Sequence, residues 1–182
     1  MPVQSKFTAV EQESPSKVPI LIPEDIMPSV MHMYENACNR YFDTKDVAAE
    51  KQVHRILAGL HDTHIQDWVG VHHEHLLTMA FAVFMAEFKM AYLPMDWEEI
   101  TRIELLLLNQ GSDSFWDFCV QVQAKNSILS GTKSHLDDTQ LHHCVELGMS
   151  TKLALHIHLE KVDVDSTLAN WLTDVKHIDD LI

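Results

Sequence analysis

Apolar side chains recur at helical spacing along most of the chain, and no stretch alternates between apolar and polar residues as a half-buried strand does. The clearest helical pattern runs from Trp97 to Val122 and is interrupted once, at Gln110-Gly111. Apolar residues lie at positions 100, 103, 106 and 107 before this interruption and at positions 115, 118, 119 and 122 after it. This pattern predicts two amphipathic helices joined by a short turn.

Residues that favour helix ends delimit these two helices. Asp96 followed by Glu99 predicts a capping box at the start of the first helix, and Ser114 followed by Asp117 resembles one at the start of the second. Gly111 stands where a helix C-terminus needs a residue that tolerates a positive φ. The sequence therefore predicts that one helix ends and the next begins within about four residues.

Apolar residues at helical spacing and residues that favour helix ends recur through the rest of the chain, and together they predict about nine helices in all. Residues 1–23 carry no helical pattern, and we expect them to form a disordered or extended N-terminal arm. The helices expected outside the central pair are Pro28 to Phe42, Thr44 to about Ala58, Asp62 to Gly70, His72 to Ala91, Asp137 to Leu147, one beginning at Ser150, and a last one capped by Asp165 or Ser166.

The composition favours an all-α fold. Glycine and proline are scarce, at 5 and 6 residues, so few turns interrupt the long periodic runs. Apolar residues make up 46% of the 182 positions, which is enough to give a core to one medium domain or two small ones. The three cysteines, Cys38, Cys119 and Cys144, lie within helical patterns without pairing spacing, which predicts buried thiols in a reducing, cytoplasmic environment.

The formal net charge of −14 limits the partners that the chain can bind. Such an acidic surface repels nucleic-acid phosphates and is attracted only weakly to anionic membranes. No apolar stretch is long enough to span a bilayer, and no signal peptide is visible. We therefore expect this chain alone to bind neither nucleic acid nor a membrane.

The central turn and the helix after it resemble the major homology region of retroviral and retrotransposon Gag capsids. That region has a Gln-Gly pair, an aromatic residue, an acidic-aromatic pair and an apolar residue, which correspond here to Gln110, Gly111, Phe115, Asp117, Phe118 and Val122. Three further segments resemble the capsid region of Gag from gypsy-type long-terminal-repeat elements, a style of Gag associated chiefly with fungal genomes. They are Val53 to Trp68, Tyr92-Leu93-Pro94-Met95-Asp96-Trp97, and the ending Leu168-x-x-Trp171-x-x-x-Val175-x-x-Ile178-Asp179.

This resemblance implies both a fold and a function. The fold would be two small helical bundles, an N-lobe over residues 24–108 and a C-lobe over residues 109–182, with a joint near residues 109–111 that lets the lobes take slightly different angles. Copies would self-associate through weak, repeated contacts into virus-like particles, with no cofactor and no small-molecule substrate. Phe115 and Phe118 would share a core with the last helix, through Trp171, Leu172 and Val175. The core side chains expected from both lobes are Trp68, Phe81, Phe84, Phe88, Trp97 and Trp171.

Several elements found in the family are missing from this sequence. The nucleocapsid zinc knuckle and a tail rich in lysine and arginine are absent, and so is the D-[ST]-G motif of an aspartic protease. We therefore expect a capsid portion, a truncated copy or a host-retained derivative of a transposable element. A host adaptor in which one lobe binds a peptide is one alternative.

The 13 histidines raise the question of a metal site. Zinc needs three or four converging ligands at about 2 Å, and ligand pairs on a helix lie three or four residues apart. Solvated positions on an acidic helical protein explain the histidines more simply, so we expect no metal. The candidates are His61, His64, His72, His73, Glu74 and His75 in one cluster, His142 and His143 beside Cys144 but off its apolar face, and His156 and His158 on different sides of a helix.

A second alternative is a helical metal-dependent phosphohydrolase of the HD type. Such enzymes use a histidine, a His-Asp pair and a downstream aspartate, for which His32, His61-Asp62 and Asp96 are the candidates. However, both aspartates are equally suited to cap helices. No nucleophile elbow, P-loop or dinucleotide-binding glycine pattern is present, and we expect the chain not to be an enzyme.

Overall fold

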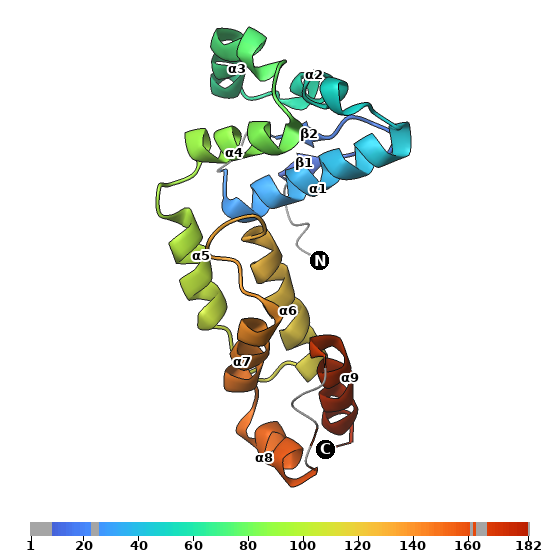
Figure 1. The fold of residues 1–182 in the computed structure, drawn as a ribbon, viewed down its shortest axis with the longest axis vertical. Helices are drawn as coiled ribbons and strands as arrows, with labels where there is room; N and C mark the ends of the chain where they lie inside the picture. Colours follow the sequence, from blue (N-terminus) through green and yellow to red (C-terminus); the bar gives the residue numbers. More distant parts are fainter. Residues whose placement is uncertain (1–8, 23–25, 161, 163–166, 182) are drawn as a thin grey trace, which may run out of the picture. The chain divides into compact units, whose positions relative to one another are not determined.

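The computed structural model describes residues 9–22, 26–160, 162 and 167–181, and most of these residues are helical (Figure 1). The prediction of an all-α fold is confirmed. The chain divides into two compact units, an N-terminal unit Met1–Met95 and a C-terminal unit Asp96–Ile182. Over the described ranges, no helix combines the length and the apolar content needed to cross a membrane.

The N-terminal unit starts with an antiparallel pair of short strands, β1 (Val10–Glu11) and β2 (Ile20–Leu21). Leu21 is buried and forms a parallel bridge with Leu60, which attaches the strand pair to the helical part of the unit. Over residues 9–22 the expected arm therefore forms two short strands with a turn between them, and its residues 1–8 and 23 lie outside the described residues. Strands of two residues are too short to show alternation in a sequence.

The first helix, α1 (Pro28–Lys45), carries proline in its first turn, as predicted. It ends at Asp46, whose φ of 47° is a left-handed conformation that aspartate tolerates better than most residues. Thr44 therefore lies inside the last turn of α1, and the expected helix from Thr44 to Ala58 is wrong. In its place two 3₁₀ turns, η1 (Ala49–Lys51) and η2 (Leu57–Gly59), flank the short helix α2 (Gln52–Ile56).

Two helices of similar length complete the N-terminal unit, α3 (Thr63–Leu76) and α4 (Phe81–Tyr92). The expected break at Gly70 is wrong, because α3 continues through this glycine and the chain leaves the helix at residues 77–80 instead. A glycine inside a helix costs only about 1 kcal/mol, which tertiary packing can offset. The side chain of Lys89 on α4 forms a 2.6 Å ion pair with Glu35, which joins α4 to α1.

The next helix, α5 (Trp97–Leu106), belongs to the C-terminal unit. Its residue Leu105 is fully buried in the core of that unit, which explains why the boundary falls before α5. The resemblance implies a boundary after this helix, at residues 108–109, so the structure moves it toward the N-terminus. Asp96 accepts no hydrogen bond as a cap, and the capping box predicted for Asp96 and Glu99 is wrong.

Four more helices form the C-terminal unit with α5. They are α6 (Phe115–Ile128), α7 (Asp138–Gly148), α8 (Thr151–Glu160) and α9 (Leu168–Asp179). Asp137 and Gln140 form a complete capping box at the start of α7. The hydroxyl of Thr167 caps α9, whereas the expected caps Asp165 and Ser166 lie outside the described residues.

Candidate functional site

The side chain of Gln110 is buried and joins two turns of the C-terminal unit. Its Nε2 donates to the carbonyl oxygen of Asp113 at 3.2 Å, and its Oε1 accepts from the backbone N–H of Ser150 at 2.8 Å. Its own backbone N–H donates to the carbonyl oxygen of Gly148 at 2.8 Å. One glutamine thus connects the turn before α6 to the turn between α7 and α8.

Two glycines, Gly111 and Gly148, lie next to these hydrogen bonds, and each is required for a different physical reason. Gly111 has a φ of +54°, which confirms the predicted positive value. The glycine does not end a helix, however, because α5 already ends at Leu106 and α6 begins at Phe115, so the turn is longer than the predicted four residues or so. Gly148 is required by space, because a Cβ there would lie 2.6 Å from Cζ of Phe118 and 2.7 Å from the carbonyl oxygen of Leu108. The backbone of α7 therefore approaches α6 and the end of α5 more closely than any side chain would permit.

Two side chains satisfy backbone N–H groups at the N-terminus of α6. The Ser114 hydroxyl accepts from the N–H of Asp117 at 3.1 Å and donates to the carboxylate of Asp117 at 2.7 Å. The N–H of Phe115 donates to Oδ2 of Asp179, at the end of α9, at 2.9 Å. The sequence predicted Ser114 as the cap but gave no signal for Asp179, because the capping aspartate lies far away in the chain.

The apolar residues of the motif all face inward. Phe115, Phe118 and Val122 are buried in one core with residues from α9, as the resemblance implied, while Asp117 is exposed. The rings of Phe115 and Trp171 meet edge to face, with centroids 6.3 Å apart. The core of this unit consists of Leu105, Phe115, Phe118, Cys119, Val122, Leu136, Leu141, Cys144, Val145, Met149, Leu153, Trp171, Leu172, Val175 and Ile178.

A second buried amide fixes the loop between α6 and α7. Asn126 Nδ2 donates to the carbonyl oxygen of Leu136 at 3.0 Å, and its Oδ1 accepts from the N–H of Leu136 at 2.9 Å. The imidazole Nδ1 of His135 lies 3.1 Å from the backbone oxygen of Asn126. Burial of Asn126 is not predictable from the sequence, since an asparagine among helical residues gives no sign of being buried.

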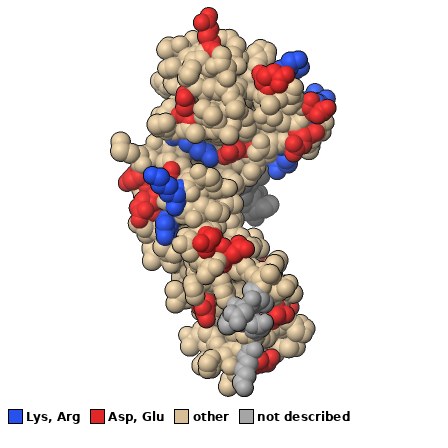
Figure 2. Space-filling view, in the orientation of Figure 1, with Lys and Arg blue, Asp and Glu red and all other residues tan. Residues whose placement is uncertain are grey.

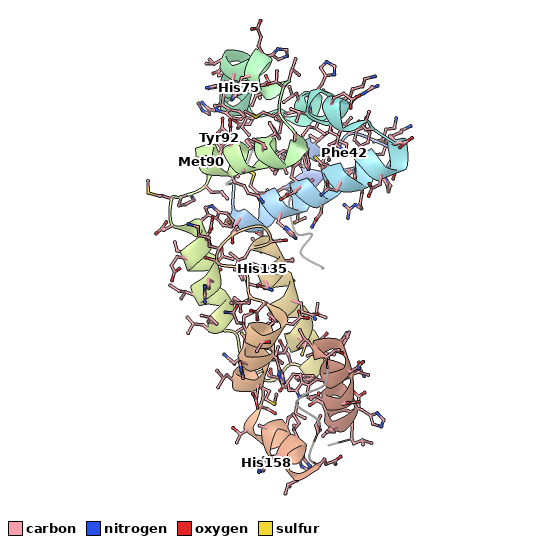
Figure 3. The ribbon with its side chains drawn as sticks, in the orientation of Figure 1. Phe42, His75, Met90, Tyr92, His135 and His158 are labelled. Carbon is pink, nitrogen blue, oxygen red and sulfur yellow. The ribbon has the colours of Figure 1, made fainter. Side chains whose placement is uncertain are left out.

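The expected aromatic core of the N-terminal unit is present with one exception. Phe81, Phe84 and Phe88 are buried on α4, but Trp68 on α3 is only partly buried, so its assignment to the core is wrong. The Trp68 ring stacks on Phe88 with centroids 5.8 Å apart and also lies edge to face with Tyr92. Tyr92 is labelled in Figure 3 near the C-terminal end of α4. Trp68 therefore covers the aromatic row of α4 from outside. In the C-terminal unit, both expected core tryptophans, Trp97 and Trp171, are buried.

The histidine clusters do not converge into a metal centre over the residues that the structure describes. His61 Nε2 lies 3.1 Å from the carbonyl oxygen of Ala58, and Asp62 accepts from two backbone N–H groups as the cap of α3. His32 belongs to the same unit, but Asp96, the last member of the phosphohydrolase set, belongs to the other one. The His-Asp pair proposed for a hydrolase is thus engaged in hydrogen bonds that stabilise helix ends.

His142 is less exposed than its position off the apolar face of α7 suggested. Its ring lies 4.0 Å from the Trp171 ring, centroid to centroid, in an edge-to-face arrangement. Its Nε2 and the Nε1 of Trp171 are buried, and neither has a hydrogen-bond partner among the described residues. Its neighbour His143 is exposed and lies near Glu146 instead, so the two histidines share no ligand position.

The three cysteines are buried, as predicted, and are poorly suited to nucleophilic chemistry. Burial raises the pKa of the Cys38 and Cys119 thiols to about 12, and it also raises the pKa of Cys144. A thiol must ionise to act as a nucleophile or metal ligand. All three therefore serve as small apolar side chains at neutral pH.

Comparison of the chain with protein-family models, with curated proteins and with solved structures gives no match.

Proposed function

We propose that this protein is a Gag-like capsid protein of a long-terminal-repeat retrotransposon and that it self-associates into shells. The observation that carries the proposal is the buried side-chain amide of Gln110, whose two hydrogen bonds join the turn before α6 to the turn between α7 and α8. The resemblance to Gag begins at this residue, and a glutamine in an ordinary surface turn would have no reason to be buried. Here Gln110 is the residue through which the turn before α6 is bonded to the turn between α7 and α8.

The rest of the motif supports the same interpretation. Its apolar members are buried and its acidic member is exposed at the start of α6, so the spacing of the motif coincides with a structural unit. The resemblance also implies a joint between the two lobes near residues 109–111. In the structure these residues lie inside the C-terminal unit, in a turn that the side chain of Gln110 holds by hydrogen bonds.

Exposed apolar side chains support self-association. A shell needs contacts between copies, and contacts between proteins place apolar side chains at their centres. Large apolar side chains with at least 44% of their area exposed occur in both units, and those with the greatest exposure are Val71, Met90, Met95, Leu107, Leu147, Leu159 and Leu181.

The charge favours protein partners over nucleic acid. The sequence has 27 acidic and 13 basic residues, and Figure 2 shows acidic side chains scattered over both units on the visible face. Such a surface repels phosphates. We infer that this chain supplies shell contacts and leaves the binding of nucleic acid to another polypeptide segment.

The proposal is tested by measuring the size of the purified chain over a range of protein and salt concentrations. Light scattering after size exclusion reports the mass, and negative-stain electron microscopy reports the shape. We expect closed or tubular particles near about 1 M salt, where a Debye length of about 3 Å screens repulsion between copies. A monomer at every concentration and salt level contradicts the proposal.

A further inference from the structure

The helix α5 exposes the face that is most apolar in its sequence. Leu105, Thr101 and Trp97 are buried along one side of the helix, and Leu105 belongs to the core of the C-terminal unit. The opposite face carries four aliphatic side chains, which we name the α5 stripe. Its members and their exposed fractions are Ile100 at 44%, Ile103 at 48%, Leu106 at 53% and Leu107 at 71%.

The helix cannot rotate to bury this stripe within its own unit. Leu105 is fully buried, and its carbonyl oxygen accepts from the thiol of Cys144 at 3.7 Å. On the side of α5 toward α6, Glu104 forms a 2.6 Å ion pair with Lys125. Rotation of α5 would break these contacts and expose its buried side chains, so the stripe keeps its outward orientation.

Charged residues of both signs border the stripe. Glu99 and Arg102 are three residues apart and so lie on neighbouring positions along one edge of the helix. Neither forms an ion pair within the described parts of the chain. Figure 2 shows basic and acidic side chains next to one another over α5.

We propose that the α5 stripe is a two-fold contact between copies of this chain, in which two α5 helices pack antiparallel. The inference rests on the proposed function and names one surface that the shell would use. A two-fold axis that crosses the stripe midway between the levels of Glu99 and Arg102 sets Ile100 of one copy against Ile100 of the other, with Ile103 on the next turn beside them. The same operation sets Arg102 against Glu99 twice, because a two-fold axis repeats every contact.

The charges and the size of the stripe favour a second copy over an unrelated partner. A copy supplies the complementary charge automatically, since the acidic and the basic residue occupy the same edge. Four partly exposed side chains offer far less than the roughly 800 Å² per partner of a standard interface. A contact this small is weak by itself and becomes effective only where many copies repeat it, as in a shell.

Charge reversal tests the antiparallel pairing. Arg102→Glu places a second carboxylate against Glu99 of the other copy, and Glu99→Arg places a second guanidinium against Arg102, so each single variant creates two repulsive pairs. The double variant restores both attractive pairs in reversed order. We expect each single change to raise the protein concentration needed for assembly by at least about tenfold, and the double variant to recover most of that loss.

The apolar part of the stripe is tested by Ile103→Ser, with Leu155→Ser as its control. Leu155 is a similarly exposed aliphatic residue on α8, outside the stripe. We expect the first change to weaken assembly by at least about tenfold and the second to leave it within about twofold. Circular dichroism melting of the dilute proteins checks that every variant is folded.

The outcomes separate this inference from the proposed function. If wild type assembles and the charge variants assemble equally well, the α5 contact is wrong and the capsid proposal stands. If the single changes weaken assembly of folded protein and the double variant fails to recover, the antiparallel pairing is wrong. If wild type stays monomeric under all conditions, the proposed function fails and this contact fails with it.

Discussion

The backbone N–H of Phe115 donates a 2.9 Å hydrogen bond to the carboxylate of Asp179, the last residue of α9. This contact closes the C-terminal unit, because it joins the first turn of α6 to the end of the last helix. A negative charge is also favourable at the N-terminus of α6, where unpaired N–H groups carry partial positive charge.

Replacing Asp179 should therefore destabilise the C-terminal unit. We expect Asp179→Ala to lower the free energy of unfolding by about 1–2 kcal/mol, as for loss of a helix cap, and Asp179→Asn to cost less because its amide oxygen can still accept. The control is Asp180→Ala, which removes only the exposed ion pair with Lys176 and should cost under about 1 kcal/mol. Urea unfolding measures all three, and equal effects at both positions would refute the capping role.

A second prediction concerns the buried amide of Gln110. Gln110→Ala leaves the N–H of Ser150 without its partner at the α7–α8 turn, so we expect a loss of about 1–3 kcal/mol in the free energy of unfolding. Gln123→Ala removes an exposed glutamine of α6 and should change stability by less than about 0.5 kcal/mol. Similar urea midpoints for the two variants would show that the Gln110 hydrogen bonds contribute nothing net.

Two glycines within helices should respond in opposite ways to the same substitution. Gly148→Ala forces a Cβ to within 2.6 Å of the Phe118 ring, so we expect a loss of about 1–3 kcal/mol or more. Gly70→Ala adds a Cβ that meets nothing within 4 Å, and it should stabilise α3 by about 0.5–1 kcal/mol. Thermal melting of both variants measures the difference, and a tolerated Gly148→Ala would contradict the close approach of α7 to α6.

The sequence predicted those features that depend on residues near one another in the chain. The caps at Asp62 and Ser114, the positive φ of Gly111 and the inward face of α6 all follow from local patterns. The predicted helix boundaries were wrong where the local sequence signals were ambiguous. Gly70 was predicted to end a helix, yet α3 continues through it to Leu76. A Cβ at this position would meet nothing within 4 Å, so the glycine is not required by space.

Features set by tertiary structure could not be predicted in this way. The apolar periodicity of α5 does not say which side of the helix faces its own core, and the buried side proved to be the one with Thr101. Likewise, the partners of Gln110 and Phe115 lie 40 and 64 residues away, so no local pattern indicates Ser150 or Asp179. The candidate site could be located by its motif, but its hydrogen bonds could not be foreseen.

Acid should weaken the N-terminal unit through His32. Burial lowers the pKa of this histidine on α1 below its ordinary value, an effect that Lys89 reinforces and Glu35 opposes. Because the folded-state pKa is the lower one, the unfolded chain binds the proton more readily. The contribution of His32 to stability is therefore fully present above about pH 6.5 and is lost as the pH drops through the pKa of the unfolded state toward that of the folded state.

The variant His32→Gln should lessen this pH dependence. We expect its melting temperature to change less between about pH 7.5 and pH 5.5 than that of wild type, because the glutamine amide does not titrate. His54→Gln, at an exposed position of α2, controls for removal of a histidine. Parallel melting curves for wild type and His32→Gln over this range would show that His32 does not set the acid response.

We expect the two units to unfold separately. Phe118 is buried where α6 meets α7, and Phe118→Ala should cost about 3–5 kcal/mol, a large share of the roughly 5–15 kcal/mol that stabilises a typical domain. Trp116→Ala is the matched control, since Trp116 is an aromatic residue of the same helix with 45% of its area exposed.

Hydrogen exchange of the full chain, read by mass spectrometry of its peptides, reports the loss of protection in each segment. We expect Phe118→Ala to raise exchange in α5 to α9 while α1, α3 and α4 keep their wild-type rates, and Trp116→Ala to change neither set. A rise in both sets would mean that residues 1–95 and 96–182 form one cooperative unit, and the two-lobed architecture that underlies the capsid proposal would then be wrong.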